Sequence, residues 1–103
     1  MTIKTTIIAA VVAIMPMAVQ AQNSVVCAIV GDLAEVIMAN RQVGVRVSDM
    51  MGIADNDPLV EALVLEAYKI PRYSSDEMQR RSVENFRNEV ETICYSRSRD
   101  QGA

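Results

Sequence analysis

The sequence holds two cysteines, Cys27 and Cys94, which lie near opposite ends of the chain that follows an apolar N-terminal segment. In an exported domain of this size, an even number of cysteines predicts a disulfide, and one pairing within the chain is possible. The bridge would close most of that chain into a single loop, which the chain-entropy model values at about 4 kcal/mol of stability. Two free thiols, or a bridge to another chain, are the alternatives.

The first twenty-one residues have the pattern of a secretory signal peptide. One positive charge, Lys4, precedes an apolar run from Ile7 to Val19, and small residues lie just before Gln22. This pattern predicts cleavage between Ala21 and Gln22 and export to the periplasm or the medium. The apolar run is shorter than the roughly 20 residues that span a bilayer. This length favours cleavage over an uncleaved anchor, so we expect no stable membrane anchor in the mature protein.

Residues 22–103 are enough for a single small domain. Aromatic residues make up 4% of the chain and tryptophan is absent, so Val, Ile, Leu, Met and Ala must build the core. This composition favours packed helices over a β-sandwich. The formal net charge is −3, whereas a nucleic-acid-binding surface normally carries a basic patch, so we expect no nucleic-acid partner.

Apolar residues recur at three- and four-residue spacing between residues 25 and 40, which predicts a first amphipathic helix. Gly44 lies just beyond its expected end. Gly31 lies inside it, where glycine costs about 1 kcal/mol relative to alanine unless another helix crosses closely there. After an extended connector, Ser48 is expected to cap a short helix that ends near Ala54. The side chains expected to turn inward from it are Met50, Met51 and Ile53.

The third predicted helix runs from Leu59 to Lys69 and is apolar on most sides, so we expect it to be the most buried helix. Either Asn56 or Asp57 can cap it; with Asp57 as the cap, Pro58 takes the first helical position at no cost. Pro71 ends the helix.

The last predicted helix begins at Ser74, which stands three residues before Glu77 in the order of a capping box. Its tail is expected to fray from about residue 96. Its inward face is expected to hold Met78, Val83, Phe86, Val90, Ile93 and Cys94. The first and last helices bring the cysteines to one end of the molecule if they run antiparallel. The sequence therefore predicts an all-α fold: a small bundle of three main helices plus one short helix, closed by one disulfide.

Several short motifs spread over the chain form a recognisable pattern. They are Cys27, Ile37-Met38-x-Asn40-Arg41-Gln42-x-Gly44, Met51-x-x-Ala54-Asp55, Ala67-Tyr68-x-x-Pro71-x-Tyr73, Phe86-x-Asn88 and Cys94. This pattern resembles a group of small, signal-peptide-bearing, uncharacterised helical proteins of proteobacteria and their phages. The resemblance implies an exported helical domain and does not imply a reaction.

No constellation in the sequence predicts catalysis. Histidine is absent, which excludes Ser–His and Cys–His nucleophiles and the commonest zinc ligand. The spacing of Asp55 and Asp57 is that of the first two ligands in a calcium-binding loop, but the positions where further ligands should follow are apolar. The pair Asp32 and Glu35, one helical turn apart, is typical of a solvated helix face. We therefore expect no enzyme activity, no cofactor and no metal site.

Two features remain as possible interaction surfaces: the joint before the last helix, and a set of methionines spread over three predicted helices. Methionine is used at adaptable binding surfaces, but in a domain with few aromatic residues these side chains are more typical of core filler. They are Met38, Met50, Met51 and Met78. Tyr68, Arg72 and Tyr73 gather around the joint before the last helix, and Tyr and Arg are enriched at binding hot spots. The alternative is that Tyr68 packs inward and Tyr73 caps the bundle. On the last helix, Arg80, Arg81 and Arg87 form a basic cluster, which interspersed glutamates make more typical of a solvated face.

These observations favour an exported helical protein that acts by binding another protein, as an inhibitor, an immunity-type neutraliser or an envelope accessory factor. The alternative is a periplasmic acid- or stress-protective chaperone. Thirteen acidic residues and an apolar third helix would allow such a protein to loosen at low pH and expose apolar surface.

Overall fold

The computed structural model describes residues 24–102, so the predicted signal peptide and its cleavage site lie outside the described residues. Within this range the fold is all-α, as predicted. A first helix covers residues 24–42. It is followed by α2 (Val47–Ala54), α3 (Pro58–Tyr68) and α4 (Asp76–Gly102). The described part therefore has three main helices and one short helix.

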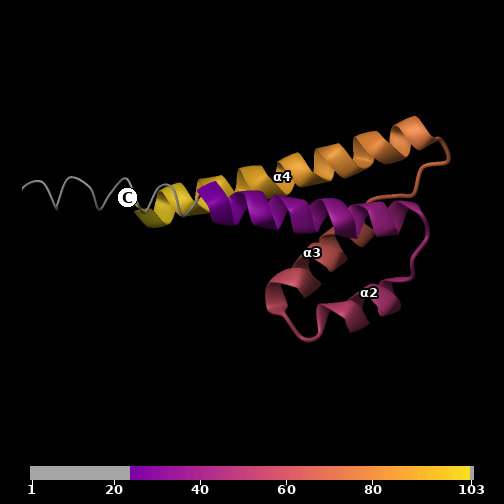
Figure 1. Ribbon diagram of the computed structural model, residues 1–103, viewed down its shortest axis with the longest axis horizontal. Helices are drawn as coiled ribbons and strands as arrows, with labels where there is room; N and C mark the ends of the chain where they lie inside the picture. The colour runs from indigo at the N-terminus through magenta and orange to yellow at the C-terminus, as the bar shows by residue number, and fades with distance from the viewer. Residues whose placement is uncertain (1–23, 103) are drawn as a thin grey trace, which may run out of the picture.

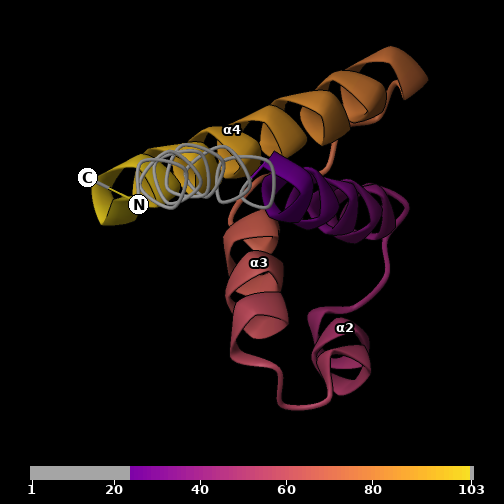
Figure 2. The ribbon, with the colours of Figure 1, turned by 60° about the vertical axis from the view of Figure 1, so that its left-hand side comes forward.

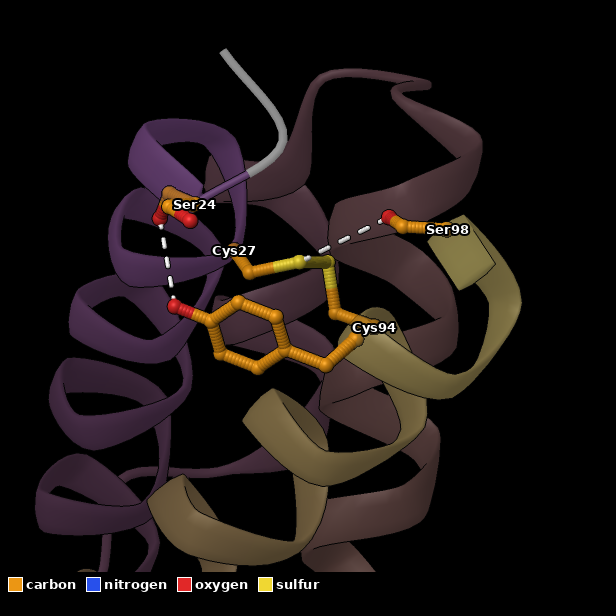
Figure 3. Close-up of a disulfide and its surroundings, with 5 residues drawn as sticks. Ser24, Cys27, Cys94 and Ser98 are labelled. Atoms are coloured by element: carbon orange, nitrogen blue, oxygen red, sulfur yellow. Dashed lines mark hydrogen bonds between the residues drawn. A yellow bond between two sulfur atoms is a disulfide. The ribbon is translucent and has the colours of Figure 1, made fainter. Parts of the chain in front are cut away.

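The first helix and α4 lie side by side and run in opposite directions (Figure 1). At the free end of this pair, Cys27 and Cys94 form the predicted disulfide, with their Cα atoms 5.6 Å apart and a sequence separation of 67. Near the bridge, the Tyr95 hydroxyl donates to the Ser24 carbonyl oxygen at 3.4 Å (Figure 3). The pair is thus joined covalently at the end where α4 finishes.

The helices α2 and α3 form a second arm that leaves the long pair at a steep angle (Figure 2). The core lies where this arm meets the pair, and Phe86 is its one aromatic residue. All four helices contribute to it. Its buried members are Ala34, Ile37, Met38, Met50, Leu63, Val64, Ala67, Phe86 and Val90. The predicted aliphatic and methionine core is confirmed.

The expectation that α3 is the most buried helix is wrong. Leu63, Val64 and Ala67 are buried, but Leu59 and Leu65 are about half exposed. The reason is the angle of the arm, since only one side of α3 meets the rest of the molecule. The first helix and α3 each supply three of the buried core residues.

The inward face of the short helix is also narrower than expected. Met50 and Ala54, one turn apart, are buried, and Met51 is partly buried. Ile53 was expected to turn inward, but it is 72% exposed because it lies past the edge of this stripe. On α4, Phe86 and Val90 face inward as predicted, whereas the predicted inward residues Met78 and Ile93 are 42% and 47% exposed.

Of the two caps predicted for α3, Asn56 and Asp57, the structure has Asp57. The backbone N–H groups of Leu59 and Val60 donate to Asp57 Oδ1 at 2.9 and 3.2 Å, and Pro58 takes the first helical position. These bonds satisfy donors that have no partner inside the helix. After the first helix, Gly44 has a φ of +95°, a backbone conformation that favours glycine.

Two other predicted caps are wrong. The cap of α2 is Arg46, which makes no side-chain cap bond, and Ser48 falls inside the first turn. At the start of α4, Met78 N–H donates to Ser75 Oγ at 3.2 Å, so Ser75 is the cap in place of Ser74. This shift by one residue removes the capping-box register with Glu77.

The end of α4 lies further along the chain than the sequence suggests. It continues to Gly102, past the region where fraying was predicted. Residues 96–102 contain no proline that would break the helix. Ser98 also lies at the disulfide, with its Oγ 3.9 Å from Cys27 Sγ (Figure 3).

Gly31 lies against the Glu91 side chain of α4. It is buried, and a Cβ at this position would overlap the Glu91 carboxyl group and lie 2.5 Å from its Cγ. A glycine inside the helix was expected to be tolerated only where another helix passes closely, and the contact with α4 fits that expectation. Gly52, inside α2, has no atom within 4 Å of the corresponding position.

The two glycines therefore predict opposite responses to alanine. Gly31→Ala should lower the free energy of unfolding by about 1 kcal/mol, because overpacking costs more than the gain in helix propensity. Gly52→Ala should raise it by about 0.5–1 kcal/mol. Urea unfolding of both variants measures the difference. If Gly31→Ala stabilises the protein as much as Gly52→Ala, the close approach to Glu91 does not exist.

Candidate functional site

A buried glutamine organises the joint between α3 and α4. Gln42 is 1% exposed and lies at the end of the first helix. Its Nε2 donates to the Pro71 carbonyl oxygen at 3.0 Å and to Ser82 Oγ at 3.3 Å, and its Oε1 accepts the Tyr73 N–H at 2.9 Å. One side chain therefore satisfies two backbone groups of the joint and binds α4. No sequence signal predicted this role, because an isolated glutamine is usually exposed.

The predicted interaction residues Tyr68, Arg72 and Tyr73 gather around the same joint. The Tyr68 hydroxyl donates to the Val45 carbonyl oxygen. Arg72 Nε donates to the Gln42 carbonyl oxygen at 3.2 Å, and the Tyr73 carbonyl accepts from Gln79 at 2.7 Å. Tyr68 and Tyr73 are half-buried, and Arg72 is exposed. These contacts hold the joint, and a partner surface at this place stays a prediction.

The surroundings of Tyr68 favour its protonated form. Burial raises the pKa of this phenol above its ordinary value of 10.0, because desolvation disfavours the charged form. The guanidinium of Arg41, 4.9 Å from the ring centroid, acts in the opposite direction. The hydroxyl therefore keeps the proton that it donates to Val45 at neutral pH.

The Gln42 network predicts a large and local effect on stability. Gln42→Ala leaves the Tyr73 N–H and the Pro71 carbonyl without their partner and should cost about 2–4 kcal/mol. Asn40→Ala is the matched control, because Asn40 makes one exposed bond within its own helix, to the Val36 carbonyl oxygen. We expect the control to change the free energy of unfolding by under about 0.5 kcal/mol. Equal losses in urea unfolding would contradict the role given to Gln42.

A second polar cluster joins the first helix to α4. Arg87 binds Asp32 through Nη2 at 2.7 Å, Glu35 through Nη1, and Glu91 through Nε at 3.1 Å. The hydrogen bonds that Arg87 donates to Glu35 and then to Glu91 raise the pKa of Arg87. For Arg87, Asp32 and Glu35, the prediction of ordinary solvated faces is wrong, since they connect two helices. Arg81 does fit a solvated face, because it pairs with Glu77 along α4 with both side chains exposed.

The first helix also presents an apolar side to solvent, which we call the outer face. Its members are Val25, Ile29 and Val36, which are 57% to 61% exposed. They recur four and seven residues apart, so they share one side of the helix. Asp32 interrupts the stripe, and its carboxylate is held by Arg87. The core-facing side, with Ile37 and Met38, points elsewhere.

A groove with a volume of about 700 Å³ lies between the disulfide end of the long pair and α3. Residues of three helices contribute to it. Its apolar lining includes Val26, Val30, Leu59, Leu63, Val90 and Ile93. Glu89 and Arg97 of α4 add opposite charges to it. On the α4 side of the groove, Ile93 is about half exposed.

Residues 24–102 hold no group of three or more His, Cys, Asp or Glu side chains that could bind a metal ion. In the same range, no helix combines the length and apolar character needed to cross a membrane. Comparison with protein-family models, with curated proteins and with solved structures gives no match. The resemblance to exported helical proteins and the expectation that the chain is not an enzyme both stay predictions.

Proposed function

We propose that this chain is exported, loses residues 1–21, and acts by binding another protein through the outer face of the first helix. An inhibitor, an immunity-type neutraliser and an envelope accessory factor are the roles that fit such a protein. The disulfide supports export, because thiols are kept reduced in the cytosol and disulfides persist in the periplasm and outside the cell.

The exposure of the outer face is the observation that carries the proposal. Aliphatic side chains gain roughly 25 cal/mol for each Å² removed from water, and a partner would supply that burial. Apolar anchors four and seven residues apart on one side of a helix are the pattern by which helices fit into a partner's groove. The core does not use these side chains, since Ile37 and Met38 on the other side of the helix serve it.

The outer face is also rigidly held. The disulfide fixes the start of the helix, Arg87 ties its middle to α4, and Gln42 anchors its end to the joint. A surface that is ordered before binding loses less conformational entropy when it binds. This rigidity favours a constitutive binding role. The acid-protective chaperone stays a prediction; it requires apolar surface that appears at low pH, whereas the outer face is exposed in the folded protein.

The double variant Ile29→Lys/Val36→Lys tests the proposal. Both positions are exposed, so the fold should persist while partner binding weakens at least about tenfold, the effect of losing roughly 1.4 kcal/mol of burial. Ile53→Lys is the control, because Ile53 is equally apolar and exposed but lies on α2. Affinity capture from envelope extract, followed by calorimetry with the recovered protein, gives the readout.

We expect the wild type and Ile53→Lys to recover the same protein and the double variant to lose it. A recovered partner that binds the double variant with unchanged affinity would show that the outer face is not the site. Repeated capture with no specific protein in the wild-type sample would reject the function itself.

A further inference from the structure

The part of α4 that lines the groove carries one acidic and one basic residue on either side of an apolar residue. Glu89, Ile93 and Arg97 are spaced four residues apart, so they form one line along the helix, with one turn between neighbours. Ile93 is 47% exposed and stands midway between the acidic and the basic residue. Within the described part of the chain, neither Glu89 nor Arg97 takes part in an ion pair.

This line of residues is complementary to itself when it is reversed. If a second α4 lies antiparallel to the first with the two Ile93 side chains facing, each Glu89 meets the Arg97 of the other copy. A two-fold axis through Ile93 generates both contacts at once, which is the condition for a closed, isologous dimer. Any acid and base on one side of a helix can be matched in this way by an axis at their midpoint; here the residue at the midpoint is Ile93, an exposed apolar side chain in the groove.

We propose that the groove receives α4 of a second copy of this chain, so that the protein is a two-fold symmetric dimer with antiparallel α4 helices. The apolar contribution comes from Ile93 together with Val26 and Leu59, which line the groove and are about half exposed. The second copy would cover Ile93, as the residues of α3 cover Phe86 and Val90 earlier in α4. The ion pairs at the two ends set the register and direction more than the affinity, as exposed charge pairs usually do.

The position of α3 agrees with this arrangement. It leaves the long pair at a steep angle and so opens a corner beside the disulfide end (Figure 2). Two such corners related by a two-fold axis can each hold the end of the other copy's long pair. On the α3 side of the groove, Glu66 is already paired with Lys69 at 2.8 Å, so these two residues add no net charge to the contact. The outer face of the first helix takes no part in this contact.

Charge reversal tests the proposal through the dissociation constant of the disulfide-bonded protein, measured by sedimentation equilibrium. Glu89→Arg alone and Arg97→Glu alone should each weaken the dimer at least about tenfold, because each places like charges opposite each other twice. The double variant Glu89→Arg/Arg97→Glu should restore the wild-type constant, since every pair is re-formed with its signs exchanged. Glu84→Arg is the control, an exposed charge reversal on α4 outside the groove, and should leave the dimer unchanged.

A wild-type protein that stays monomeric at millimolar concentration would overturn the proposal. So would a double variant as weak as the single variants, or a dimer that persists in Ile93→Lys. Circular dichroism confirms that each variant is folded. Because the outer face lies elsewhere, Ile29→Lys/Val36→Lys should remain dimeric, so failure of the dimer and failure of the proposed partner binding are separate results.

Discussion

The covalent link between Cys27 and Cys94 sets the register in which the first helix and α4 pack. Because the two helices run antiparallel, each step away from one cysteine is matched by a step away from the other. Gly31 therefore meets Glu91, and Asp32 and Glu35 meet Arg87. A loop of 67 residues is closed by this bridge, which the chain-entropy model values at about 4 kcal/mol, comparable to the total stability of a small domain.

The opposite end of the long pair is held by polar contacts. Gln42 fixes the joint between α3 and α4 and contacts Ser82, so the chain is tied at both ends of the first helix. The core fills the space between these ties. With so few aromatic residues, the buried members of the core are mainly aliphatic residues and methionines. The rigid first helix then presents its outer face to solvent.

Much of the fold could be predicted from the sequence, because the signals involved are local. Apolar periodicity gave the helices, Asp57 and Pro58 gave the start of α3, and the cysteine count gave the bridge. The errors concern what depends on the angles between helices. An apolar α3 is central only in a bundle whose helices are all parallel or antiparallel, and here it projects sideways, which leaves Leu59 and Leu65 exposed.

The site could be predicted only in part. The register that the cysteines impose would have led from Asp32 and Glu35 to Arg87 by counting along the two helices. No such route leads to Gln42, because its partners are backbone groups of a joint whose path the sequence does not specify. The outer face and the groove share this difficulty, since an exposed valine and a buried one look the same in the sequence until the neighbouring helices are placed.

The covalent register is tested most directly by peptide mapping of the purified protein after alkylation under denaturing, non-reducing conditions. The account predicts no alkylated cysteine and one cross-linked species that joins the peptides containing Cys27 and Cys94, which separates when a reductant is added. Alkylation of both cysteines without reductant, or a cross-link between two copies of the chain, would contradict it.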